Sequence, residues 1–359
     1  MRWKLIPRSL WCLLITFCLF SIRVPDLLAS SSTLPKIFIL HSYEQGHVCG
    51  QPQHDGVMAA LRETGFMKGQ NIELRVYYMD TKRKNNTPEL IMNQAHIALE
   101  KIRSFRPTIL VTLDDNAFRT VALKLADTSL PIVFSGMNGQ PEDYDKVVRF
   151  IDSRSRPGHN ITGVYEKLHI ADAFRVHCRL FPGVKKVRII LDTSPTGRAI
   201  HKQINLELAR ESVPCAWDIR IVRSWEAYQE QIRLANRSPE IGAIYPVALL
   251  LKDSAGRTYT APEIFAWTVK NSQRPEIAVN YAFTRLGLFG GAAVDFFAMG
   301  HQAGKMVAAI LKGESAGNIA IEDAEKYALV FNLKRARQLG IKIPSDVLMA
   351  ADDIITADK

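Results

Sequence analysis

The chain has 359 residues, of which 47% are hydrophobic and 23% charged, and it carries a net charge of +10. This composition is typical of a folded protein and excludes a disordered chain, and the length allows two domains with full cores. The basic residues are scattered and form no stripe with interleaved aromatic side chains. That pattern argues against nucleic acid as a partner.

The first 29 residues have the pattern of a secretory signal peptide. A basic start is followed by 14 nearly continuous apolar residues, Ser9 to Ile22, and by a small-residue cleavage site after Ala29. A membrane span needs about 20 residues, so an uncleaved N-terminal anchor is the alternative. Four basic residues and one acidic residue leave with this segment, so the mature chain keeps +10 − 3 = +7. We therefore expect a periplasmic or otherwise extracytoplasmic protein.

Five cysteines are present, and two of them, Cys12 and Cys18, fall within the predicted signal peptide. The remaining three are Cys49, Cys178 and Cys215, an odd number without metal-ligand spacing. We expect one disulfide at most, and buried thiols are the favoured interpretation.

Strands and helices alternate along the first part of the chain. The predicted elements are the strand Lys36–Leu40, a helix after Pro52, the strand Ile72–Tyr78, a helix opened by Pro88, the strand Thr108–Leu113, a helix with Phe118, Val121, Ala122 and Leu125 on one face, and the strand Ile132–Phe134. Such strand–helix–strand units predict parallel pairing, because a parallel pair needs a long crossover.

A polar segment, Gly136 to Asn160, is predicted as a linker or crossover, and the alternation then restarts. The later elements are strands at 161–164, 187–191, 216–222, 241–245 and 277–280, with helices between them, a tight turn at Gly290-Gly291, a helix Asp295–Leu311 and two short strands in the tail. We predict an α/β fold of two doubly wound parallel-sheet lobes. Lobe I comprises residues 36–158 plus about 281–315, and lobe II comprises 160–280 plus about 316–359.

Polar residues follow the predicted strands, and in open α/β sheets ligands sit beyond the carboxyl ends of the strands. The candidate ligand-binding residues are Ser42, Tyr43, Asp115, Asn116, Ser135, Asn138, Tyr165, Thr193, Tyr245 and Asp295. If the ligand is an amino acid, its ammonium needs an acidic partner. Asp115 or Asp295 is the predicted partner, because each stands where a strand gives way to a helix.

The pair Asp114-Asp115 has three interpretations: catalytic carboxylates, a metal site or a helix cap. We predict that one aspartate caps the following helix and that the other faces a cleft. No histidine or second carboxylate lies at metal-ligand spacing nearby, and no nucleophile, phosphate-loop or cofactor motif occurs in the chain. We therefore expect no cofactor and no enzyme, although an α/β enzyme using carboxylates for acid and base work remains an alternative.

Several segments resemble the ABC-transporter substrate-binding proteins that include tryptophan and tyrosine uptake receptors. The resemblance covers about residues 36–355, and its most specific part is PGHNITGV, Pro157 to Val164. The other similar segments are Ser42-Tyr43, 61–66, 69–71, 107–113, 131–134, 181–187, 290–295 with Gly300, 310–314 and 339–344.

The resemblance implies a type I periplasmic-binding fold whose two lobes are joined by three crossovers and close on a small ligand without performing chemistry. It further implies delivery of a polar or amino-acid-like ligand by a monomer to an ABC permease in the membrane. The His-Ser-Tyr opening also resembles members that serve as sensory inputs to membrane kinases or cyclases. This chain departs from the family at Asp114-Asp115, where a Gly-Thr pair is common, and at Cys49, where a tryptophan is common.

Overall fold

The computed structural model describes residues 34–356. Its strands form a first sheet of six parallel strands and a second set of strands that is also mainly parallel. The predicted signal peptide lies outside the described residues. Within the described part of the chain, no helix combines the length and apolar character needed to cross a membrane.

The first sheet has the order β12-β5-β4-β3-β1-β2. Its strands are β1 (Lys36–His41), β2 (Glu73–Tyr78), β3 (Ile109–Leu113), β4 (Ile132–Met137), β5 (Ile161–Tyr165) and β12 (Glu322–Asp323). The associated helices are α1 (Gly50–Glu63), α2 (Pro88–Phe105), α3 (Asp115–Thr120), η1 (Ala122–Leu125), α4 (Pro141–Asp145), α10 (Phe296–Leu311) and η2 (Ala316–Asn318).

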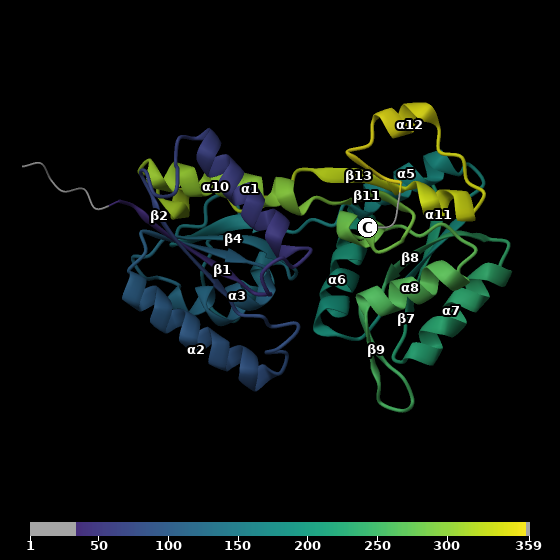
Figure 1. Ribbon diagram of the computed structural model, residues 1–359, viewed down its shortest axis with the longest axis horizontal. Coiled ribbons are helices and arrows are strands. Elements are labelled where there is room, and N and C mark those ends of the chain that lie inside the picture. The colour runs from purple at the N-terminus through teal and green to yellow at the C-terminus, as the bar shows by residue number, and fades with distance from the viewer. Residues whose placement is uncertain (1–33, 357–359) are drawn as a thin grey trace, which may run out of the picture. The chain divides into compact units, whose positions relative to one another are not determined.

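Helices cover both faces of this sheet, because its strands are apolar on both sides. Ile37 and Ile39 pack with residues of α1 and α10, whereas Phe38 and Leu40 point to the opposite face and pack with α2. Figure 1 shows α1 and α10 side by side along one face of β1 and β4, with α2 and α3 beyond the other. Glycine permits the close approach of α1 and α10, since a Cβ on Gly56 would lie 2.2 Å from the Phe297 carbonyl oxygen.

The second set of strands contains the parallel sheet β7-β6-β8 and the sheet β11-β13-β14. Isolated bridges Ile244–Glu276, Ile277–Gly290 and Asn280–Val294 connect β8 to β11. The strands are β6 (Lys186–Leu191), β7 (Ala216–Ile221), β8 (Ile241–Val247), β11 (Gly290–Val294), β13 (Tyr327–Asn332) and β14 (Asp353–Ile355), with a hairpin of β9 (Leu250–Lys252) and β10 (Thr258–Thr260). The helices are α5 (Ile170–Leu180), α6 (Pro195–Arg210), α7 (Trp225–Arg237), α8 (Ala261–Asn271), α9 (Tyr281–Arg285), α11 (Leu333–Gln338) and α12 (Ser345–Met349).

Most predicted elements are present, and four differ. Of the two short strands predicted in the tail, the one at 319–321 is not formed, and β12 covers Glu322–Asp323 instead. The single predicted helix carrying Phe118 and Leu125 is split into α3 and η1. The predicted strand Ile277–Asn280 is reduced to isolated bridges. The tight turn predicted at Gly290-Gly291 is wrong, because both glycines lie inside β11, where a Cβ on Gly290 would lie 2.1 Å from the Val330 carbonyl oxygen.

The strand β5, which sequence analysis placed in lobe II, pairs with β4 in the first sheet. The polar segment from 136 to 160 therefore connects two strands of the same sheet. A fully buried apolar strand such as β5 carries no signal of which sheet it joins. The chain passes between the two sets of strands at three places in the described residues: between β5 and β6, between β11 and α10, and between β12 and β13.

Candidate functional site

Polar and ionisable side chains collect at the carboxyl ends of the first sheet. His41, Ser42 and Tyr43 end or follow β1, Asp114 follows β3, and Glu166 follows β5. All these strands are parallel, so their carboxyl ends lie at one edge of the sheet. This edge is the position at which open α/β sheets bind ligands.

Asp114 is the central residue of this edge. Asp114 is only 4% exposed. Its Oδ1 accepts a hydrogen bond from Gln53 Nε2 at 3.0 Å, whereas its Oδ2 has no hydrogen-bond partner among the described residues. The Gln53 Oε1 accepts from Ser135 Oγ at 2.8 Å, which fixes the amide. Burial raises the pKa of Asp114 to about 7, so this carboxyl exchanges its proton near neutral pH.

The helix cap predicted for one of the two aspartates is not formed. Asp114 occupies the N-cap position of α3 with a φ of 66°, but its side chain makes no cap bond. The hydroxyl of Ser42 takes that role: it accepts from the Ala117 N–H at 2.8 Å and donates to the Leu113 carbonyl at 2.8 Å. The prediction is wrong because a neighbouring strand supplies the capping oxygen, which leaves the Asp114 carboxyl free for another role.

Glu166 is a second buried carboxyl at the same edge. It is 8% exposed, and burial, followed by the charge of Asp114, raises its pKa to about 8. Lys82 supplies positive charge nearby: its Nζ lies 4.1 Å from the centre of the Tyr43 ring, and its charge opposes the pKa rise of both acids. Two buried acids against one lysine leave this edge suited to a cationic group.

A pair of unpartnered atoms flanks the start of α1. His41 Nε2 lies 3.0 Å from His54 Nδ1, while His41 Nδ1 is buried without a hydrogen-bond partner in the described structure. A Cβ built on Gly50 would lie 3.4 Å from both His41 Nδ1 and Asp114 Oδ2. Burial, and then the charge of His54, lowers the pKa of His41 to about 3, so this histidine is neutral at physiological pH. No group of three or more potential metal ligands occurs among residues 34–356.

The structure brings part of the predicted site residues to this edge. Ser42, Tyr43 and Ser135 are buried around Asp114. Asp115 accepts hydrogen bonds from the Tyr144 hydroxyl and from the backbone N–H of Asn138.

Asn116 is also engaged within the protein. Its Nδ2 donates to Thr81 Oγ1 at 2.9 Å, and its Oδ1 accepts from the Arg119 guanidinium at 2.8 Å. Tyr165 is buried, its hydroxyl bonds to the Gln140 amide, and the Arg154 guanidinium lies 5.3 Å from its ring centre. These two side chains therefore have partners close to the strand ends.

The remaining predicted residues, Thr193, Tyr245 and Asp295, lie outside the group of side chains around Asp114. Thr193 is exposed after β6, and its carbonyl accepts from Arg198 Nη1 at 2.5 Å. Tyr245 is 1% exposed inside β8, with its ring 6.3 Å from that of Phe174. Asp295 caps α10, since its Oδ1 accepts from the Ala298 N–H at 2.9 Å.

Sequence analysis did not select Gln53, Lys82, Asp114 or Glu166 as ligand-binding residues, and the structure places all four at this edge. Glu166 had a usable signal, because it follows the buried run that forms β5. Gln53 had no such signal in the sequence. It lies in the first turn of α1, and its contact with Asp114, 61 positions further along the chain, is visible only in the structure.

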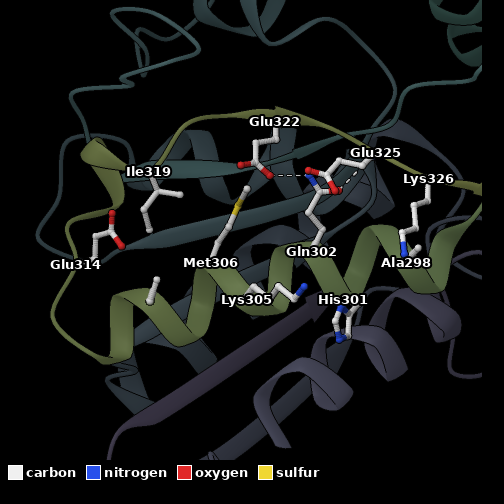
Figure 2. A pocket seen from close by; sticks show the side chains of 11 residues that line it. Ala298, His301, Gln302, Lys305, Met306, Glu314, Ile319, Glu322, Glu325 and Lys326 are labelled. Atoms are coloured by element: carbon white, nitrogen blue, oxygen red, sulfur yellow. Dashed lines mark hydrogen bonds between the residues drawn. The ribbon is translucent and has the colours of Figure 1, made fainter. Parts of the chain in front are cut away.

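A surface pocket of about 430 Å³ lies elsewhere, between α10 and residues 314–326. Figure 2 shows Gln302 of α10 linked to Glu322 and Glu325, with His301 and Lys305 on the same helix. We call the side chains at the carboxyl edge of the first sheet the strand-end cluster: His41, Ser42, Tyr43, Gln53, Lys82, Asp114, Ser135 and Glu166. None of them lines this pocket, which is therefore a separate feature.

Comparison with known proteins gives a family match over most of the chain. The family described as ABC transporter substrate binding protein matches residues 47–224 and 259–355. A tyrosine-binding protein from Clostridioides difficile is 18% identical over 277 residues, which are 77% of this chain and 73% of that protein.

Solved structures agree at the level of the fold. A conserved domain protein from Vibrio cholerae matches with a TM-score of 0.63 at 20% identity, and a ligand-free, open substrate binding protein with adhesive properties from Clostridium difficile matches with 0.65 at 16%. An ABC domain in complex with L-Trp from Streptococcus pneumoniae matches with 0.65 at 18%. Each covers 90% of this chain and 100% of the other. These matches confirm the predicted periplasmic-binding fold with parallel-sheet lobes.

Members of the matched family are extracytoplasmic, non-enzymatic solute-binding components of ABC transporters, which confirms the prediction of a binding protein for transport. The family match covers well over half of the chain, and the strand-end cluster lies in the part that it spans or directly beside it. The chain therefore belongs to the ABC transporter substrate-binding protein family.

Proposed function

We propose that this protein captures an amino-acid-like ligand at the carboxyl edge of the first sheet and delivers it to an ABC permease. The observation that carries the proposal is the buried Asp114 carboxyl, whose Oδ2 has no partner in the described structure. A buried polar atom without a hydrogen bond costs free energy, and a ligand ammonium compensates that cost with a charge-assisted hydrogen bond.

Asp114 replaces Asp115 and Asp295 in this hypothesis. The Asp295 carboxylate already caps α10, and the Asp115 carboxylate already has Tyr144 and Arg119 as partners. Glu166 is proposed to be the second acid facing the ammonium, because the charge of Asp114 contributes to the raised pKa of Glu166.

The start of α1 offers the complementary half of an amino-acid site. The first N–H groups of a helix lack partners within the helix and favour negative charge. Gly50 opens α1 directly beside the Asp114 carboxyl. The Gln51 N–H already donates to the His47 carbonyl at 2.9 Å, and Pro52 has no N–H. We therefore propose that the Gly50 N–H donates to the ligand's carboxylate and that Ser42, Tyr43 and Ser135 line the site.

Two similar proteins support the ligand class. One is named a tyrosine-binding protein, and the other is described in complex with L-Trp. Tyr43 and Tyr165 of this chain offer aromatic surface near the same strand ends. We therefore propose an aromatic or similar amino acid as the first ligand to test.

The lobe division, lobe closure and export belong to the same proposal. With β5 and β12 in the first sheet, we place the connections between the lobes after Glu166, around Asp295 and after Asp323. A ligand held by both lobes shifts the balance toward a closed form by its differential affinity.

The mature protein is proposed to act as a monomer after loss of the first 29 residues. Small-angle scattering with saturating ligand tests closure, and an unchanged profile contradicts it.

Isothermal titration calorimetry with L-tyrosine and L-tryptophan, and with their analogues lacking the amino group, tests the site. We expect binding of at least one amino acid and loss of binding when the amino group is absent. Asp114→Asn keeps the shape but removes the charge, and we expect an affinity loss of about 2–5 kcal/mol, roughly thirtyfold or more.

Asp253→Asn is the matched control. The Asp253 carboxylate accepts from the Ala255 and Arg257 N–H groups within the β9–β10 hairpin, so the variant costs at most about 1 kcal/mol of stability while the affinity stays unchanged. An Asp114→Asn variant that binds as tightly as the unaltered protein removes Asp114 from the site. Absence of binding by every amino acid tested rejects the ligand class and leaves the family assignment intact.

A further inference from the structure

Two cysteine thiols of the second set of strands face one another. Cys178 lies in the last turn of α5, and Cys215 directly precedes β7. Their Sγ atoms are 2.7 Å apart, and both are free thiols. An S–S bond measures about 2.05 Å, so a small adjustment of the two side chains is sufficient to form one.

The contact between these elements does not depend on the sulfur atoms alone. Arg175 lies one turn before Cys178 on α5, and its Nη2 donates to Glu211 Oε2 at 3.0 Å and to the Ser212 carbonyl at 3.2 Å. Lys167 adds an ion pair with Glu211 at 3.6 Å. Several independent interactions therefore hold the segment before β7 against α5.

The environment of the pair suits thiol–disulfide exchange. Both cysteines are partly exposed, so a reagent can reach them. The two sulfur atoms are in direct contact, and the proton between them can lie on either one, so either thiol can become the attacking thiolate. Cys49 differs, because burial raises its pKa and makes it a poor nucleophile.

We propose that Cys178 and Cys215 form a disulfide once the protein is outside the cytoplasm, with a disulfide compound or disulfide-carrying protein as the oxidant. One of the two cysteines loses its proton to water, and its thiolate attacks one sulfur of the oxidant and releases the other half as a thiolate. The second cysteine then gives its proton to that leaving thiolate and attacks the sulfur of the first cysteine. This step releases the second half as a thiolate, which takes up a proton from water. Two protein thiols are oxidised and one external disulfide is reduced to two thiols.

The location and the loop length give this bond a structural purpose. Extracytoplasmic compartments maintain disulfides, and this family works there. The bond joins residues 37 positions apart and restricts the unfolded chain. We expect the oxidised protein to melt roughly 5–10 °C above the reduced protein. Ligand affinity is expected to stay unchanged, since neither cysteine belongs to the strand-end cluster.

Peptide mapping of the exported protein tests the proposal directly. The protein is purified without reductant, its free thiols are alkylated under denaturing conditions, and it is digested. We expect one linked peptide pair containing Cys178 and Cys215, which disappears on treatment with dithiothreitol, and an alkylated Cys49. Alkylation of Cys178 and Cys215 as free thiols, even after incubation with oxidised glutathione, overturns the proposal. A link that involves Cys49, or a link between two copies of the chain, also overturns it.

Melting curves give the second measurement. Cys178→Ser and Cys215→Ser are each expected to melt at the temperature of the reduced protein and to lose the response to reductant. The unaltered protein, compared in oxidised and reduced glutathione, provides the same measurement if a variant fails to fold. An equal melting temperature in both buffers, with the linked peptide absent, contradicts the proposal.

Discussion

Two buried acids in different parts of the molecule show how a structural carboxylate differs from a candidate ligand-binding one. Glu276 is 0% exposed and is paired with Arg335, whose guanidinium also donates to the carbonyls of Val269 and Ser272. Asp114 is 4% exposed, and among residues 34–356 its carboxylate accepts a hydrogen bond from the Gln53 amide alone. Burial raises the pKa of both, so the pKa alone does not distinguish them.

The partners make the distinction. Both carboxylate oxygens of Glu276 accept hydrogen bonds from the Arg335 guanidinium, and Oε2 also accepts from the Phe289 N–H. This pair therefore connects the segment before β11 to α11. Asp114 retains an unpartnered oxygen, Oδ2, which lies 3.4 Å from the position of a Cβ on Gly50. Perturbed ionisable groups concentrate at functional sites, which supports the proposal that a ligand completes the hydrogen bonding of Asp114.

Breaking the Glu276 pair gives the largest expected effect. Arg335→Met leaves a fully buried carboxylate without its cation, at a cost of about 3–5 kcal/mol of unfolding free energy. Thermal denaturation measures this loss, and ligand affinity serves as the internal control because it is expected to persist. The double variant Glu276→Gln with Arg335→Met is expected to recover part of the stability. Arg335→Met with unchanged stability contradicts the structural role.

Removing the Asp114 charge is expected to increase the stability of the ligand-free protein near neutral pH, whereas breaking the Glu276 pair lowers it. The folded-state pKa of Asp114, about 7, lies above the ordinary value of 3.8, so the folded protein binds the proton more tightly than the unfolded chain does. This contribution stabilises the fold below pH 4 relative to higher pH and is lost progressively as the pH rises toward 7. Each unit of pKa shift corresponds to about 1.4 kcal/mol.

Asp114→Asn removes this dependence. In the ligand-free state we expect the variant to be as stable as the unaltered protein near pH 4, and increasingly more stable than it as the pH rises toward 8. The measurement is the difference in melting temperature between the two proteins at each pH across that range. Other buried groups titrate in both proteins, so their contributions cancel in this difference. Parallel curves for the two proteins contradict the raised pKa.

The same titration predicts the pH dependence of binding. An ammonium pairs with a deprotonated carboxyl, and the pKa values of Asp114 and Glu166 are about 7 and 8 in the structure. Affinity is expected to rise between pH 6 and 8, by up to about tenfold per unit for each proton released. Calorimetry in buffers of different ionisation enthalpy detects that release, and pH-independent affinity argues against pairing with these acids.

The sequence predicts the fold better than the site, and the reason lies in the range of the interactions. Buried runs such as 109–113 and 187–191 identify their strands locally, and the polar ends of those strands indicate the edge. The choice of Asp114 over Asp115 depends on Ser42, which lies 75 positions from the N–H that it caps. The placement of β5 depends on pairing with β4 and β12, for which its own residues carry no signal.

The most local prediction concerns the space between His41 and Asp114. Gly50→Ala places a methyl group 3.4 Å from His41 Nδ1 and Asp114 Oδ2, an ordinary contact distance that the fold accommodates. If a ligand group occupies this space, the methyl group displaces it, and we expect an affinity loss of roughly tenfold, about 1.4 kcal/mol. Alanine also favours the helix, so stability is expected to remain equal or to increase slightly. Gly183→Ala is the matched control, because no heavy atom lies within 4 Å of its Cβ position. Equal affinities for the two variants place the ligand elsewhere along the edge, whereas weakened binding by Gly50→Ala alone locates the ammonium or carboxylate at the start of α1.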